Sequence, residues 1–396
     1  MAESVTDSLK LADRVNRIGA SATLAVLQDA ERLRAQGIDV VDFGPGEPDF
    51  PTPNHIKQAA VRALEEDFTK YTPTAGIPAL RKAVCDWHAR ELRSRYEPRE
   101  CVVTVGGKHG VFEALSALVS RDDPVLIPVP YWVSFPEIVN YLGGRPVAVP
   151  TDEAAGFRLT AAGLERAWVE GTRVVILNSP SNPSGAIVDP EEFARILALC
   201  RRRGAWLLSD ECYSHFVYDG APFSIASVAD SKPHLIIAGS LSKTFSMTGW
   251  RVGYLLAPEP IAQAVTRLQS HSTSNPTSIA QKAALAALTG PMDTVQTMLA
   301  EYARRRARVL EGLRAIPSLR CTEPQGAFYA YPNARAWMDR AGVKTTTELT
   351  RRLLDDARIA VVPGEAFGTD SHFRLSYATS MDRITEGLRR LEQFFR

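Results

Sequence analysis

The chain has 396 residues, of which 45% are hydrophobic and 23% charged, and its formal net charge is +1. These proportions are typical of a globular protein, and the length predicts two domains. The near-zero charge gives no electrostatic reason to expect a nucleic-acid partner, and no apolar stretch is long enough to predict a membrane partner. Five scattered cysteines without a C-x-x-C spacing argue against a metal site or disulfide framework and favour a cytoplasmic location.

In chain order, residues 8–36 predict an N-terminal arm and a helix. From about residue 100 to 260, short apolar segments alternate with helical patterns, which predicts a largely parallel sheet with helices on both faces. The expected strands are 101–105, 124–128, 145–149, 173–178, 205–210, 234–239 and 251–256. A long charged helix is expected from 291 to 313, followed by strands at 326–331, 358–362 and 372–378 and helices at 345–356 and 381–395.

These elements predict an α/β fold with two domains. A large domain with a mostly parallel sheet would span residues 49–290. A smaller α+β domain would combine the N-terminal arm, residues 1–48, with the C-terminal part, residues 291–396.

Three turns at expected strand ends carry polar groups. Strand 101–105 runs through two glycines into a helix, which points backbone N–H groups and a positive helix end at an anion. Strand 173–178 ends in the turn-forming Ser179-Pro180-Ser181-Asn182-Pro183-Ser184-Gly185, and strand 205–210 ends at Asp210. Open α/β sheets bind ligands at such ends, and a carboxylate there keeps a pyridine nitrogen protonated. Taken alone, these residues are also explained as an ordinary turn and a helix cap.

The most specific stretch is the run Ser240-Leu241-Ser242-Lys243-Thr244-Phe245-Ser246-Met247-Thr248-Gly249-Trp250-Arg251. A lysine amine forms an imine with an aldehyde, while hydroxyls and a guanidinium bind phosphate. The run therefore indicates a site for a phosphorylated aldehyde. Near the C-terminus, the alternating segment 372–378 carries one arginine, Arg374, which could bind a carboxylate bidentately.

Together these motifs resemble those of the class I pyridoxal-phosphate aminotransferases, fold type I, and the likeness to their aspartate aminotransferase group covers essentially the whole chain. The resemblance implies pyridoxal 5′-phosphate as cofactor, with Lys243 as its Schiff-base residue and Asp210 on the ring nitrogen. Lys108 would act through its backbone, and its side chain is expected to be a surface charge. The other implied cofactor contacts are Gly107, Lys108, Trp132, Asn182, Tyr213, Ser240, Ser242 and Arg251.

The same resemblance implies a reaction that moves an amino group between an L-α-amino acid, aspartate or another, and a 2-oxo acid such as 2-oxoglutarate. Arg374 would bind the substrate α-carboxylate, and the other implied substrate contacts are Gly46, Trp132 and Asn182. Tyr71 resembles the tyrosine that reaches the phosphate of the neighbouring subunit. A homodimer with shared active sites is therefore expected.

Three alternatives bear on this reading. Relatives that use aspartate often bind its distal carboxylate with a cation in the N-terminal arm, whereas residues 18–24 contain none. Ser21 and Thr23 could hydrogen-bond a carboxylate there, and alanine or aromatic donors stay open. The same cofactor also serves lyases that catalyse α,β-elimination. A non-catalytic sensor would carry an additional N-terminal DNA-binding domain, for which we expect no room.

Overall fold

The computed structural model describes residues 11–20, 22–228 and 230–396. Its centre is a seven-stranded sheet in the order β2-β8-β7-β6-β5-β3-β4. The strands are β2 (Cys101–Thr104), β3 (Pro124–Val129), β4 (Arg145–Pro150), β5 (Val174–Asn178), β6 (Trp206–Asp210), β7 (Leu235–Ser240) and β8 (Gly253–Leu256). Each boundary lies within two residues of its prediction, because short apolar runs between turn residues mark buried strands clearly.

The sheet is parallel except for β8, which runs antiparallel to both β2 and β7. The connection from β7 to β8 forms turns without a helix, whereas a parallel return requires a crossover, usually through a helix. Gly253, the first residue of β8, therefore pairs with Ser240, the last residue of β7. A Cβ at Gly253 would lie 2.4 Å from the backbone nitrogen of Gly107, so glycine is required for this close approach.

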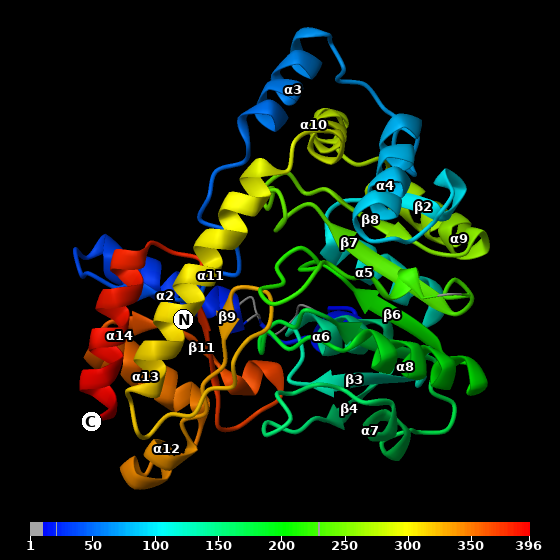
Figure 1. Ribbon diagram of the computed structural model, residues 1–396. Coiled ribbons are helices and arrows are strands. Elements are labelled where there is room, and N and C mark those ends of the chain that lie inside the picture. The colour runs from blue at the N-terminus through cyan, green and yellow to red at the C-terminus, as the bar shows by residue number, and fades with distance from the viewer. Residues whose placement is uncertain (1–10, 21, 229) are drawn as a thin grey trace, which may run out of the picture.

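Helices cover both faces of this sheet (Figure 1). They are α5 (Gly107–Leu118), α6 (Ser134–Leu142), α7 (Ala161–Arg166), α8 (Pro190–Arg202) and α9 (Glu259–Ser270). Helix α8 shows sequence features that favour helix formation. Pro190 occupies its first turn with two glutamates, and two arginines occupy its last turn, which suits the helix dipole. At one end of the sheet, α3 (Asn54–Glu65) and α4 (Pro78–Glu91) pack on α10 (Ser278–Thr289).

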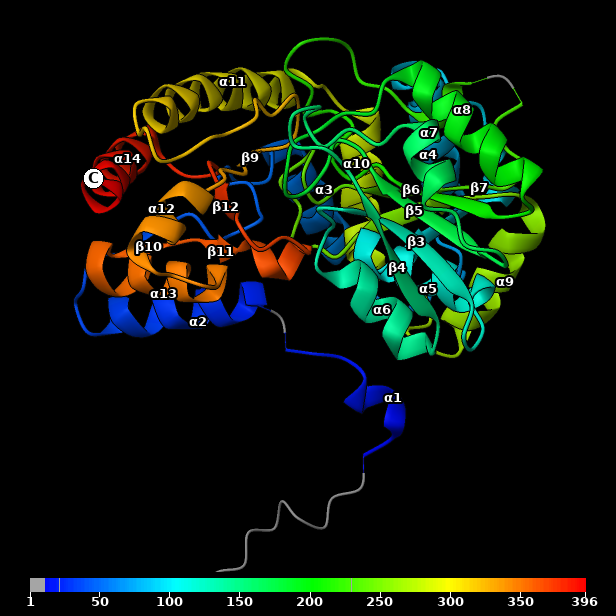
Figure 2. The ribbon, with the colours of Figure 1, turned by 90° about the horizontal axis from the view of Figure 1, so that it is seen from below.

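A second group of elements lies beside the sheet (Figures 1 and 2). Its helices are α2 (Ala22–Ala35), α11 (Asp293–Arg314), α12 (Arg335–Ala341), α13 (Thr346–Ala357) and α14 (Met381–Phe395). Its strands are β1 (Val41–Asp42), β9 (Tyr329–Ala330), β10 (Ile359–Ala360), β11 (Val362–Pro363) and β12 (Phe373–Ser376). Strand β1 pairs with β10, and the other three form the antiparallel order β11-β12-β9. Because segments before residue 48 and after residue 290 meet here, we propose the domain boundaries 1–48, 49–290 and 291–396.

Strand β9 is shorter than its predicted range 326–331. Ala327 has a φ of 57°, in the left-handed region, which turns the backbone out of the extended conformation just before the strand begins. The pairing that remains joins Tyr329 to Ser376 and Ala330 to Leu375. Only a two-residue strand therefore forms next to β12.

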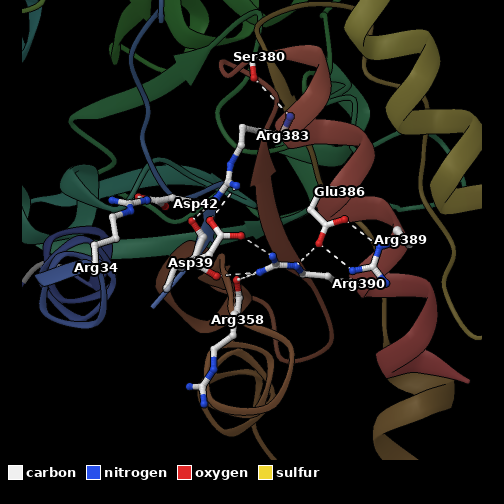
Figure 3. A network of polar contacts seen from close by, with 10 residues as sticks. Arg34, Asp39, Asp42, Arg358, Ser380, Arg383, Glu386, Arg389 and Arg390 are labelled. Atoms are coloured by element: carbon white, nitrogen blue, oxygen red, sulfur yellow. Dashed lines mark hydrogen bonds and ion pairs between the residues drawn. The ribbon is translucent and has the colours of Figure 1, made fainter. Parts of the chain in front are cut away.

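An ionic network holds β1 against α14 (Figure 3). Asp39 pairs with Arg390 and with Arg383 of α14, at 2.5 and 2.9 Å. These two arginines hold the pKa of the Asp39 carboxyl below its ordinary value. Asp42 accepts a hydrogen bond from the backbone N–H of Gly44 at 2.9 Å. The network thus fixes the backbone that continues from β1 toward the sheet.

The N-terminal arm precedes α2, and its short helix α1 (Asp13–Asn16) lies against α6 of the large domain. The arm also contacts the large domain at Gly19, whose N–H donates to Glu137 of α6 at 2.8 Å. Across the described residues, no helix combines the length and apolar character needed to cross a membrane. Within the same ranges, no three His, Cys, Asp or Glu side chains form a group that could hold a metal ion.

Candidate active site

The polar residues at the strand ends meet at one edge of the sheet. Asn178 and Asp210 are the last residues of β5 and β6 and pair with each other, and Ser240 ends the neighbouring β7. Because β8 is antiparallel, its beginning lies at the same edge, and Arg251 precedes it by two residues. The reversed strand therefore adds an arginine to an edge that otherwise consists of strand carboxyl ends.

A cavity of about 580 Å³ opens at this edge and is also lined from the small domain. Among the described residues that line it are all of the predicted site residues except Tyr71. They are Gly46, Gly107, Lys108, Trp132, Asn182, Asp210, Tyr213, Ser240, Ser242, Lys243, Arg251 and Arg374. Its size suits a cofactor together with a small substrate. Tyr71 does not line the cavity, and the residue is 89% exposed.

One side of the cavity forms a cradle for an anion. A Cβ at Gly106 would lie 2.6 Å from Nη2 of Arg251, and one at Gly107 would lie 3.1 Å from Cβ of Ser240. The first N–H groups of α5, the serine hydroxyl and the guanidinium thus converge without an intervening side chain. Arg251 adopts a φ of 54°, and its Nη1 donates to the Thr248 carbonyl at 2.8 Å. A phosphate group fits this donor set.

Lys243 lies in the cavity next to this cradle. Its Nζ donates to the backbone carbonyl of Gly46, so the amine touches the segment that follows β1. Burial lowers the pKa of the amine from its ordinary value. The fraction of neutral, nucleophilic amine is therefore larger at neutral pH than for a surface lysine. Ser242 is also buried, and its N–H donates to Oγ of Ser240 at 3.1 Å.

Asp210 presents a buried carboxyl to the cavity. Burial raises its pKa to about 6, although the N–H of Cys212, which donates to Oδ1 at 3.1 Å, and the charge of Lys243 oppose this shift. A cation beside this group would stabilise the carboxylate, as a protonated pyridine nitrogen does. The neighbouring Glu211 is also buried but does not line the cavity, and its Oε1 accepts hydrogen bonds from Ser209 and a backbone N–H.

Arg374 of β12 faces the cavity from the small domain. Its Nη1 donates to Oδ1 of Asn182 at 3.0 Å, and its Nη2 donates to the Gly44 carbonyl at 2.6 Å. The guanidinium is buried, and its Nε has no hydrogen-bond partner among the described residues. A buried guanidinium that lines a cavity is suited to an incoming carboxylate. Asn182 is held in turn by Asn178, whose Oδ1 accepts from its N–H at 2.8 Å.

The side chain of Lys108 was expected to be an ordinary surface charge. It is exposed, but it lines the cavity, and its Nζ lies 5.0 Å from the ring centroid of Trp132. Partial burial, and to a lesser degree Arg251, lower the pKa of this amine. The structure therefore places a further cation at the cavity. Nearby, Gly19 and Ala20 of the arm also line the cavity, whereas Ser21 and the side chain of Thr23 lie outside the described residues.

Sequence reasoning missed Tyr329, which also lines the cavity. Its hydroxyl oxygen lies 2.7 Å from that of Tyr213, and its ring lies beneath Arg374. The sequence contained a weak signal only, because Tyr329 and Tyr331 both fall in the predicted strand 326–331 and on the same face of it. Periodicity alone gave no reason to choose between them.

The cavity as a whole fits pyridoxal phosphate. The glycine cradle with Ser240 and Arg251 suits the phosphate, the buried carboxyl of Asp210 suits the ring nitrogen, and the amine of Lys243 suits the aldehyde. The hydroxyl of Tyr213 is available to a ring oxygen. Each group of the cofactor thus meets a partner of matching chemistry.

Known proteins resemble this chain closely. The family model for aminotransferase class I and II matches residues 38–391. An aspartate aminotransferase of Geobacillus stearothermophilus is 44% identical over 98% of this chain and 99% of its own length. A probable aspartate/prephenate aminotransferase of Aquifex aeolicus is 43% identical, over 97% of this chain and 98% of its own length. The structure of a Thermus thermophilus aspartate aminotransferase with maleate superimposes with a TM-score of 0.93 at 39% identity, over 97% of this chain and 99% of that one.

Proposed function

The chain belongs to the class I and II aminotransferases, and we propose that it uses pyridoxal phosphate to move the amino group of aspartate to 2-oxoglutarate. Transfer of an amino group between an amino acid and a 2-oxo acid is the activity of this family, which uses that cofactor. The names of the relatives support aspartate as the donor. The observation that carries the proposal is the meeting of the Lys243 amine, the Asp210 carboxyl and the Arg374 guanidinium at one cavity.

We propose that Gly107, Ser240, Ser242 and Arg251 hold the phosphate together with the backbone of Lys108. Asn182 and Tyr213 bind the ring oxygen, Trp132 forms a wall of the site, and Asp210 keeps the ring nitrogen protonated. When bound, pyridoxal phosphate supplies a ring that accepts the electrons left on the substrate Cα after the proton leaves.

Lys243 carries the proton in this mechanism. Its amine would hold the cofactor at rest and would be available as a base beside the substrate Cα once an amino acid is bound. Because burial lowers its pKa, the free amine accepts the Cα proton as a general base. The protonated amine would then act as a general acid and give this proton up again. The Gly46 carbonyl, which accepts a hydrogen bond from Nζ, would help to hold the amine in place.

Arg374 is proposed to orient the substrate through its α-carboxylate, and Arg374→Ala tests this. Loss of one partner of a buried charge pair costs about 2–5 kcal/mol. The KM for amino acids and 2-oxo acids should therefore rise roughly 30-fold or more. Steady-state kinetics with an amine that lacks an α-carboxylate provides the control, since its KM should not change. An unchanged KM for every amino acid would contradict this role.

A dicarboxylic substrate requires a second cation for its distal carboxylate, and we propose that Lys108 supplies it. Among the described residues that line the cavity, the arm segment contributes only Gly19 and Ala20, which are uncharged. The three cations Lys243, Arg251 and Arg374 already have proposed roles. The amine of Lys108 is held over Trp132 at the same cavity. The Thermus enzyme, whose structure contains the dicarboxylate maleate, supports a substrate of this class.

Lys108→Met should raise the KM for aspartate and 2-oxoglutarate about tenfold or more, because a hydrogen bond to a charged group contributes about 1.5–3 kcal/mol. The KM for alanine should stay within about twofold, because alanine has no distal carboxylate. Lys282→Met is the matched control, since Lys282 also lies over an aromatic ring, Phe68, but does not line the cavity. An equal rise for aspartate and alanine would exclude the proposed contact.

A panel of amino donors tests the overall function. Each donor is added to the holoprotein without a 2-oxo acid, and the absorbance of the bound cofactor and the products are followed. The proposal predicts conversion by aspartate to the amine form of the cofactor, which 2-oxoglutarate then reverses. Release of ammonia and pyruvate from cysteine derivatives, without any 2-oxo acid, would instead identify a lyase.

We also propose a homodimer with shared active sites. Tyr71 is highly exposed and does not line the cavity of its own chain, so its proposed contact with a phosphate requires a second copy. The exposed apolar side chains Val61 and Leu64 of α3 occur in the same part of the chain. The mass of the holoprotein in solution tests the arrangement: twice the chain mass supports it, and a monomeric active enzyme contradicts it.

A further inference from the structure

One buried hydroxyl lies between the groups proposed to bind the cofactor and the substrate. Tyr329 of β9 is 1% exposed, and its hydroxyl oxygen lies 2.7 Å from that of Tyr213. A Cβ on Gly46 would lie only 2.9 Å from the same oxygen, so the hydroxyl also packs against the backbone that contacts Lys243. Its ring lies beneath Arg374, with Cζ of the guanidinium 4.6 Å from the ring centroid.

The register of the small sheet explains this position. Tyr329 pairs with Ser376 across the antiparallel strands β9 and β12. Arg374 precedes Ser376 by two residues and is therefore on the same face, diagonal to Tyr329. Diagonal neighbours lie within reach of aromatic and long side chains. Strand pairing thus brings a tyrosine ring under the guanidinium while its hydroxyl extends to Tyr213.

The number of hydroxyl protons determines the direction of the hydrogen bond between Tyr213 and Tyr329 when the cofactor is bound. Burial raises the pKa of both tyrosines, that of Tyr329 to about 12, so both keep their protons at neutral pH. The two hydroxyls form one hydrogen bond in which either can donate. When Tyr213 donates its only proton to the ring oxygen of the cofactor, Tyr329 must be the donor between them. A hydroxyl that accepts one hydrogen bond donates a stronger one, because linked hydrogen bonds polarise each other.

We propose that Tyr329 is a positioning residue with two separate actions. Its hydroxyl strengthens the hydrogen bond from Tyr213 to the ring oxygen of the cofactor, and its ring holds the guanidinium of Arg374 in place for the substrate carboxylate. This inference rests on the proposed function. It couples the cofactor contact of the large domain to the carboxylate contact of the small domain through one side chain.

Tyr329→Phe and Tyr329→Leu separate the two actions. The phenylalanine variant removes only the hydroxyl. More negative charge would then stay on the ring oxygen of the cofactor. The nitrogen that joins Lys243 to the cofactor would therefore bind its proton more tightly. The pH midpoint of the visible absorbance change of the holoprotein should therefore rise by about half a pH unit. The KM for aspartate should change less than twofold, because the ring under Arg374 remains.

The leucine variant removes the ring as well. It should show the same rise of the pH midpoint and, in addition, a KM for aspartate that is at least about threefold higher, because a cation–π contact is lost. Tyr331→Phe is the matched control. Tyr331 is equally buried and close in sequence, but its hydroxyl bonds Thr369 at 2.6 Å and it does not line the cavity. The control should titrate at the wild-type midpoint.

The outcomes distinguish this inference from the proposed function. A Tyr329→Phe midpoint equal to that of the wild type, or an equal shift in Tyr331→Phe, overturns the action on the cofactor. A Tyr329→Leu variant with the wild-type KM overturns the action on Arg374. The proposed function itself fails on different results: a wild-type chain that takes up no pyridoxal phosphate, a Lys243→Ala variant that keeps the wild-type visible absorbance, or release of ammonia and pyruvate from cysteine derivatives without a 2-oxo acid.

Discussion

Replacing Lys243 with alanine is expected to lower the rate of transamination by about four orders of magnitude or more. General acid–base catalysis alone contributes up to about 10⁴-fold, and the variant loses both the proton carrier and the amine that holds the cofactor. Stopped-flow measurement of the aspartate half-reaction, with a saturating cofactor concentration, gives the rate. The visible absorbance of the resting holoprotein should be lost in the same variant.

Lys243→Arg is the control for charge. Arginine keeps a cation near the Gly46 carbonyl but offers no neutral amine at neutral pH. Both variants should therefore be inactive. If Lys243→Arg were active, the positive charge alone would be sufficient, and wild-type turnover in Lys243→Ala would refute the assignment.

Asp210→Asn is expected to change activity and stability in opposite directions. In the holoenzyme it removes the carboxylate from a buried pair with the ring nitrogen, which costs about 3–5 kcal/mol and thus roughly two to nearly four orders of magnitude in rate. In the apoprotein the same substitution removes a buried carboxyl. Burial raises the pKa of this carboxyl to about 6. Ionising that group in the folded chain opposes folding, so its removal should stabilise the apoprotein.

The pH dependence of that stabilisation follows from the raised pKa. The ordinary value is 3.8, so the folded apoprotein binds this proton more tightly than the unfolded chain does. Below about pH 4 the wild type and Asp210→Asn should be equally stable. As the pH rises through about 4 to 6 the wild type loses stability, and above pH 6 the variant should be more stable by about 3 kcal/mol.

Glu211→Gln provides the matched control for activity. Glu211 is the next residue, it is buried, and burial raises its pKa to about 7, but it does not line the cavity. Its transamination rate should stay near that of the wild type. Denaturant unfolding of the apoproteins at several pH values measures the stabilities. A Glu211→Gln variant as inactive as Asp210→Asn, or an Asp210→Asn apoprotein less stable than wild type at pH 8, would contradict the account.

Much of the large domain could be predicted from the sequence because its strands are short apolar runs that end in turn residues. The end of β6 at Asp210 and the end of β7 at Ser240 were predicted to within one residue. In a parallel sheet, strand carboxyl ends share one edge, so the predicted residues there were expected to lie together. The direction of β8 was not evident from the sequence. It depends on whether the connection between β7 and β8 crosses over the sheet, and this is determined by the turns in that connection rather than by the composition of the strands.

The small domain and the long-range contacts were harder to predict. Arg374 was found because a lone arginine stands in an alternating strand, but its bonds to Gly44 and Asn182 join segments far apart in the chain. Tyr329 carried no motif, since its position depends on the pairing of β9 with β12. For Lys108 the resemblance implied a contact through the backbone and a side chain that is a surface charge, and only the fold places this side chain at the cavity beside Trp132. Local patterns gave the residue types, whereas tertiary packing determined their partners.

The most direct test of the account is to trap the cofactor on the protein. The holoprotein is treated with borohydride, digested, and mapped by mass spectrometry. We expect a single modified peptide, with reduced pyridoxal phosphate attached to Nζ of Lys243, and no modification in Lys243→Ala. Attachment to another lysine, or a wild-type protein that remains unmodified after incubation with pyridoxal phosphate, would contradict the central claim.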